Sequence, residues 1–159
     1  MRVWVGFSTT NLWISRLIRW FTKSKASHAW IAFESQELGT KIVLEAHYTF
    51  RAVPYSFFAR QNKVVAEVEM VGDTSSMVKK CTEFLGTDYD YTGIAGGIVV
   101  SLGRWFKHKW RNPWGNPKAQ TCSESVVRAL KAAKYPNSEI LDPESTTPQE
   151  LMAFLGAML

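Results

Sequence analysis

The order of hydrophobic patterns along the chain constrains its fold more than any other sequence feature. Apolar and polar residues alternate, as in half-buried strands, within residues 2–7, 28–33, 41–50 and 63–70. Apolar residues recur at helical spacing within residues 12–21, 74–85 and 120–133. Two further helices are predicted from a proline at Val53–Pro54, continuing to Phe58, and from a capping box formed by Thr147 and Glu150. One strand, one helix, about three strands and then helices predict an α+β domain whose small antiparallel sheet packs against helices.

Length and composition indicate one globular unit. With 159 residues, the chain is expected to form a single domain over 1–159 that buries roughly 70% of its unfolded surface. Hydrophobic residues make up 46% and charged residues 21%, which excludes a disordered chain. No apolar run approaches the ~18 residues needed to span a bilayer. Two cysteines are too few for a disulfide framework.

The net charge of +5, with a pI near 9.3, suits anionic surfaces such as nucleic acid, cell wall or phospholipid without selecting one. The N-terminus reads as a strand and lacks the pattern of a secretory signal. We therefore expect synthesis in the cytoplasm. The final location stays undecided, and export to a cell wall or virion would need another route.

Cys122 is the candidate nucleophile because it stands at the start of the helix predicted at 120–133. Backbone amides at a helix N-terminus are unpaired and favour a thiolate, which lowers the pKa of a cysteine. The other cysteine, Cys81, lies on the apolar stripe of the helix at 74–85 and is interpreted as a core residue. The spacing of cysteines and histidines shows no zinc pattern, and no cofactor is expected.

A cysteine nucleophile needs a histidine to accept its proton and a third group to hold the imidazole ring. His28 begins a predicted strand, and Glu45 lies on the next one, so the two side chains can meet across the sheet. His47 shares the predicted face of Glu45 and is the alternative third member. His108 lies in a basic loop and is interpreted as solvated.

Four segments together resemble the circularly permuted branch of the NlpC-type papain-like cysteine peptidase superfamily, especially its YiiX-like members. In chain order they are LWISRLIRWFTKSKASHAWIAF, VLEAH, GTDYDYTG and TCSESVVRAL. The histidine strand comes first and the cysteine helix last, and the resemblance covers roughly residues 12–155. It implies the permuted NlpC-type papain-like fold.

The resemblance also implies site roles: Cys122 as nucleophile, His28 as base, Glu45 as the group that orients the imidazole, and Tyr89 near the oxyanion. The expected reaction is acyl transfer through a thioester, as in a thiol protease or amidase. Cell-wall peptide (peptidoglycan) is the leading substrate, and a phage-borne lytic enzyme would fit this reading.

Two other functions are kept as alternatives. One is a lipid-directed acyl hydrolase or acyltransferase, for which the apolar stretch 94–102 and the tryptophans Trp13 and Trp20 would serve an acyl chain. The other is a non-catalytic binding or structural module, for example in a phage particle.

The basic segment 104–118 contains Trp105, Trp110 and Trp114, which can contact an anionic wall polymer or a lipid surface. A solvated surface loop explains that pattern equally well, and a nucleic-acid partner is not expected. The oligomeric state is left undetermined.

Overall fold

The computed structural model of the chain describes residues 1–11, 15–16, 19–20, 23–88 and 121–156. Within these ranges, five strands and four α-helices are present, together with one short 3₁₀ helix. The strands are β1 (Val3–Thr9), β2 (His28–Ser35), β3 (Thr40–Ala46), β4 (Phe50–Pro54) and β5 (Lys63–Glu69). The helices are α2 (Tyr55–Gln61), α3 (Thr74–Thr82), α5 (Cys122–Ala132), η1 (Ser138–Ile140) and α6 (Pro148–Phe154).

The strands form one sheet in the order β4-β3-β2-β1-β5, and every neighbouring pair is antiparallel. The N-terminal strand β1 therefore lies between β2 and β5, next to the edge of the sheet. The predicted α+β class, with an antiparallel sheet and packed helices, is confirmed.

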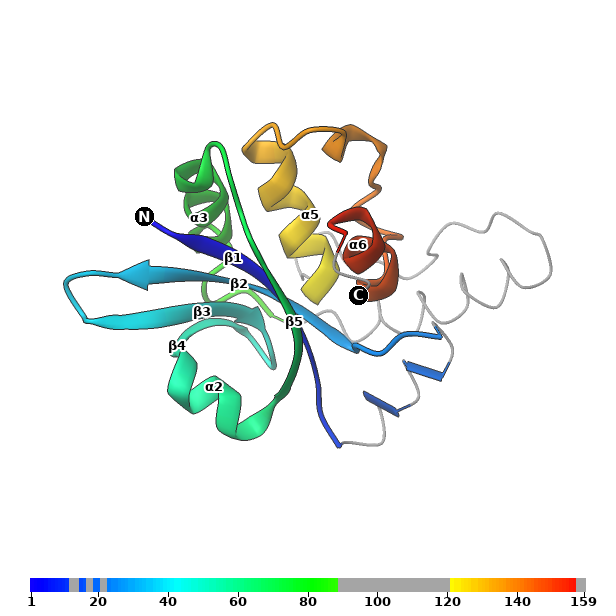
Figure 1. Cartoon of the computed structure of the whole chain (residues 1–159), viewed down its shortest axis with the longest axis horizontal. Coiled ribbons are helices and arrows are strands. Elements are labelled where there is room, and N and C mark those ends of the chain that lie inside the picture. Colours follow the sequence, from blue (N-terminus) through cyan, green and yellow to red (C-terminus); the bar gives the residue numbers. More distant parts are fainter. Residues whose placement is uncertain (12–14, 17–18, 21–22, 89–120, 157–159) are drawn as a thin grey trace.

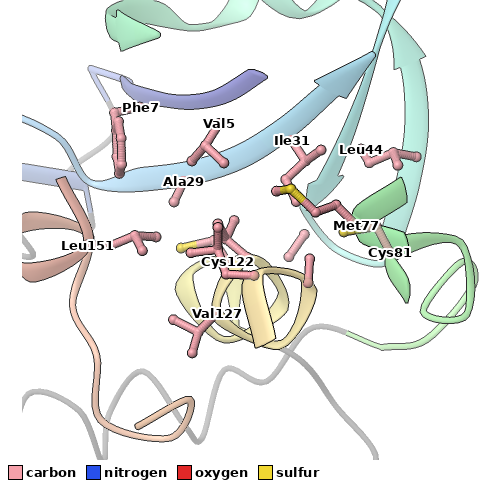
Figure 2. Close-up of a cluster of buried hydrophobic side chains, with 14 of the residues drawn as sticks. Val5, Phe7, Ala29, Ile31, Leu44, Met77, Cys81, Cys122, Val127 and Leu151 are labelled. Carbon is pink, nitrogen blue, oxygen red and sulfur yellow. The ribbon is translucent and has the colours of Figure 1, made fainter. Parts of the chain in front are cut away.

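Helices cover both faces of the sheet (Figure 1). The larger core lies on the face covered by α3, α5 and α6, and it contains Val5 and Ile31 of the sheet together with Cys122, Met77 and Leu151 of the helices (Figure 2). The smaller core lies beneath α2, whose Phe58 packs against Trp30 and Val43. No helix in the described ranges is long and apolar enough to cross a membrane.

Alternation along β1 explains why both cores form. Val3, Val5 and Phe7 are fully buried on the larger core, as their spacing predicts. On the opposite face, the ring of Trp30 lies against Gly6, and a Cβ at Gly6 would lie 2.2 Å from Trp30 Cζ2. The glycine is needed here because the indole ring occupies the space of a side chain.

The predicted strand over 41–50 and the predicted helix from Val53 are wrong in their boundaries. The chain turns between Ala46 and Phe50, where the His47 N–H donates to the Thr49 carbonyl at 3.1 Å, and β4 then pairs with β3. Alternation continues through this turn without glycine or proline, so the pattern did not reveal it. Pro54 ends β4 and precedes α2 as its N-cap, which delays the start of the helix to Tyr55.

Candidate active site

The candidate nucleophile Cys122 is the first residue of α5. Thr121 caps the helix: its hydroxyl accepts from the Glu124 N–H at 3.3 Å, and the Glu124 carboxylate accepts from the Thr121 N–H at 3.4 Å. This capping box fixes the first turn but does not engage the amides of Cys122 and Ser123, which have no acceptor within the helix. The sulfur therefore lies at the positive end of the helix dipole.

Apolar packing sets the position of α5. Val126, Val127 and Leu130 are at most 1% exposed, and all three belong to the larger core. Burial of side chains of this size contributes about 1.5–3 kcal/mol each. Cys122 belongs to the same core and is 7% exposed, so the docking of the helix also places the sulfur.

Strand pairing brings His28 and Glu45 together. The register of β2 with β3 places Ile31 opposite Leu44, so the first residue of β2 lies beside the end of β3. His28 Nε2 lies 3.0 Å from Glu45 Oε2. The Glu45 side chain is 1% exposed and that of His28 is 15% exposed, so the pair is shielded from water.

Cys122 and His28 interact directly. Burial alone would raise the pKa of the Cys122 thiol, but hydrogen bonding and charge interaction with His28 lower it below its ordinary value. A backbone hydrogen bond from Ala29 and the hydroxyl of Ser123 act in the same direction. Because Nε2 faces Glu45, the nitrogen that remains for the sulfur is Nδ1.

The His28 ring carries the complementary charge. Burial opposes its protonation, but its interactions with Cys122 and then Glu45 outweigh burial and raise the pKa of His28. Burial likewise opposes the charge on Glu45, whose pKa is nevertheless lowered by His28 and by Arg51. These interactions favour a Cys122 thiolate paired with a His28 imidazolium, which in turn contacts the Glu45 carboxylate.

The structure thus brings together three of the sequence-predicted residues, Cys122, His28 and Glu45. The alternative third member, His47, packs its ring against Tyr48 with centroids 4.5 Å apart, while Glu45 provides the hydrogen bond to Nε2 of His28. The remaining predicted site residues, Tyr89, Trp105, Trp110 and Trp114, lie outside the described residues, as do Trp13 and the stretch 94–102.

Sequence reasoning missed Arg51. Its Nε and Nη2 atoms lie 2.9 and 2.6 Å from Glu45 Oε1. Arg51 stands directly opposite Glu45 in the ladder between β3 and β4. The signal that would have found it is the hairpin register, which depends on the unmarked turn before Phe50.

Comparison with known proteins shows a likeness in fold to a solved structure. No protein-family model and no curated protein sequence matches the chain. The fold is similar to that in the crystal structure of the metalloprotein YiiX from Escherichia coli O157:H7, DUF1105, with a TM-score of 0.58 and 17% sequence identity. The match covers 82% of this chain and 64% of YiiX, so this chain spans less than two thirds of the length of that protein. At this identity the likeness concerns the fold.

YiiX is described as a metalloprotein. Among the described residues, no group of three or more His, Cys, Asp or Glu side chains is arranged to hold a metal ion. His28 and Glu45 instead hydrogen-bond to each other, and Glu45 also binds Arg51, a cation. The donor set therefore suits proton transfer better than metal binding.

Proposed function

We propose that the chain is a cysteine hydrolase of the amidase or endopeptidase type, with Cys122 as nucleophile, His28 as general base and acid, and Glu45 as the group that orients the imidazole. The observation that carries the proposal is the contact chain from the Cys122 thiol through His28 to Glu45. Three separate elements, α5, β2 and β3, supply these side chains, and each side chain changes the pKa of its neighbour.

The reaction follows from this arrangement. The Cys122 thiolate attacks the carbonyl carbon of an amide, and the electron pair of the C=O bond moves to oxygen. The backbone amides at the start of α5 provide hydrogen bonds for this oxyanion, and one such donor is worth about 10²–10³-fold in rate. The protonated His28 donates its proton to the leaving nitrogen, the C–N bond breaks, and a thioester remains.

Water completes the cycle. His28, now neutral, removes a proton from a water molecule that attacks the thioester carbonyl. The C–S bond breaks, the carboxylic acid is released, and the Cys122–His28 pair regains its charged form. General acid–base catalysis of this kind contributes about 10²–10⁴-fold. Glu45 keeps Nδ1 of His28 directed at the sulfur through both steps because it holds Nε2.

The order of the motifs supports membership of the permuted NlpC-type papain-like superfamily. The histidine strand precedes the cysteine helix in this chain, as in that branch, and the fold is similar to that of YiiX. Peptide bonds of peptidoglycan are the proposed substrate because members of the superfamily cut them. The net charge of +5 suits an anionic wall polymer.

Product analysis with two substrates tests the proposal. Purified peptidoglycan fragments and phospholipid vesicles are each incubated with the wild-type chain, Cys122→Ala and Cys81→Ala, and the products are identified by mass spectrometry. We expect new peptide ends from the wild type and from Cys81→Ala, and none from Cys122→Ala. Release of fatty acid by the same two proteins would instead identify a lipid acyl hydrolase. No product from either substrate, together with an ordinary Cys122 thiol, would identify a non-catalytic module.

A further inference from the structure

Both oxygens of the Glu45 carboxylate are occupied, each by a different cation. Oε2 faces His28, whereas Oε1 accepts two hydrogen bonds from Arg51, at 2.9 and 2.6 Å. A carboxylate held at one oxygen alone could rotate about its terminal bond. With both oxygens engaged, the lone pair that faces the imidazole is fixed in direction.

The backbone that carries Arg51 is itself held in place. The next residue toward the N-terminus, Phe50, is 2% exposed and packs edge-on against Phe84. Its N–H donates to the Thr87 carbonyl, and its carbonyl accepts from the Gly86 N–H, each at 2.9 Å. Arg51 therefore enters the site from a strand that is hydrogen-bonded on both sides, by β3 and by residues 86–87.

Charge balance gives Arg51 a second effect. A Cys122 thiolate, a His28 imidazolium, the Glu45 carboxylate and the Arg51 guanidinium sum to zero. Without the guanidinium, the same buried cluster would carry one net negative charge. Nearby negative charge favours protonation of the Cys122 thiolate and of the Glu45 carboxylate, so the thiolate would persist over a narrower range of pH.

A further titratable group, His47, faces this cluster. His47 of the β3–β4 turn is half-buried, and its pKa is lowered by burial and then by the charge of Arg51. It is therefore neutral at about pH 7 and leaves the charge balance unchanged. Arg51, with a side chain 28% exposed, supplies the balancing charge.

We propose that Arg51 is a positioning residue that holds the Glu45 carboxylate against His28 and thereby favours the thiolate form of Cys122. The inference rests on the proposed role of Cys122 as nucleophile. Arg51 acts through Glu45 and His28 and does not touch the reacting atoms.

The chain contains a matched control for this role. Arg2 also donates from Nε and Nη2 to a glutamate on a neighbouring segment, Glu69, at 2.9 Å each. That pair is exposed and lies near β5, at the end of the sheet opposite to β4. Removal of Arg2 therefore tests loss of an arginine–glutamate pair without a change at Cys122.

The test measures alkylation of Cys122 by iodoacetamide as a function of pH, in a Cys81→Ala background so that one thiol remains. The proteins compared are the parent, Arg51→Met, Arg51→Gln, Arg51→Lys and Arg2→Met, each checked for folding by circular dichroism. We expect the midpoint of the alkylation profile to move up by about one pH unit in Arg51→Met and Arg51→Gln. Arg51→Lys keeps the charge, so its midpoint should stay close to that of the parent. The midpoint of Arg2→Met should equal that of the parent.

Equal midpoints in Arg51→Met and Arg2→Met would overturn the proposal. So would loss of folding in both neutral variants, because Arg51 would then be a folding residue. A parent midpoint near the ordinary thiol value of about 8.5 is a different result. It would reject the proposed function itself and, with it, the basis for a role of Arg51.

Discussion

The two cysteines of this chain are both free, both buried and both on helices that pack against the same core, yet their thiols differ in acidity. Burial raises the pKa of Cys81 to about 12. Cys122 is also buried, but its interaction with His28 lowers its pKa. Burial alone therefore makes a thiol inert, and a buried thiol becomes reactive only where a charged partner is buried with it.

Helix position widens the difference. Cys81 lies in the last turn of α3, where the dipole places partial negative charge. Cys122 lies in the first turn of α5, where unpaired amide N–H groups place partial positive charge at the N-terminus of the helix. The same residue type thus meets opposite ends of two neighbouring helices, which Figure 2 shows together in one cluster.

The largest expected effect is the difference in alkylation between the two thiols of the wild-type chain. At about pH 7, a thiol of pKa about 12 is a thiolate in roughly one molecule in 10⁵. We expect Cys122 to react with iodoacetamide at least about 10³-fold faster than Cys81, measured by peptide mass spectrometry at timed intervals. Comparable rates in the folded protein would contradict the comparison, and labelling in urea provides the control in which both thiols are accessible.

A smaller effect should follow from making Cys122 resemble Cys81. In His28→Gln the sulfur stays buried but loses the imidazolium, so burial raises its pKa without opposition. At a pH of about 6.5, we expect the alkylation rate of Cys122 to fall roughly 10²-fold. Ser138→Ala, a buried polar substitution on η1, serves as the control. An unchanged rate in His28→Gln would mean that the helix terminus alone activates the thiol.

The smallest effect concerns Glu45 and the stability of the fold in acid. Because the pKa of Glu45 is lowered by folding, its ionised form stabilises the native state above its ordinary value of about 4.3. This stabilisation is lost as the pH falls through the lowered pKa. We expect Glu45→Gln to reduce the free energy of unfolding near neutral pH by about 2 kcal/mol, the worth of hydrogen bonds to a charged group.

Urea titrations across this acidic range make the measurement. The difference between wild type and Glu45→Gln should shrink as the pH falls below about 4. The exposed carboxylate variant Glu69→Gln should show a much smaller difference at every pH, since its pair with Arg2 is solvated. A constant difference for Glu45→Gln would show that its loss acts through packing and not through charge.

Residue type and spacing made Cys122, His28 and Glu45 candidates, with His47 as the alternative to Glu45, and the family resemblance supplied their expected roles. A carboxylate within the apolar run VLEAH needs a buried partner, and a histidine at the start of the preceding strand can supply it. The capping box formed by Thr121 and Glu124 also matches the sequence pattern T-x-x-E. The core of β1 followed from simple alternation.

The hairpin from β3 to β4 was beyond prediction for a physical reason. Residues 47–49 turn without glycine, proline or asparagine, and the alternation of apolar residues continues across them. Nothing local marks the reversal, which is fixed by tertiary contacts of Phe50 with Phe84 and Thr87. Arg51 lies opposite Glu45 only in the register that this turn sets. Because the turn was not predicted, the role of Arg51 in the site was not predicted either.

The membership of Cys122 in the larger core has a consequence for when the chain becomes reactive. Its partner His28 is synthesised long before α5, and the apolar face that docks the helix is the face that delivers the sulfur. A nascent or partly unfolded chain thus carries an ordinary thiol, and the acidic one arises only on completion of the tertiary structure. The reactive thiol therefore forms late in folding, and the rate at which Cys122 is alkylated reports whether the tertiary structure is complete.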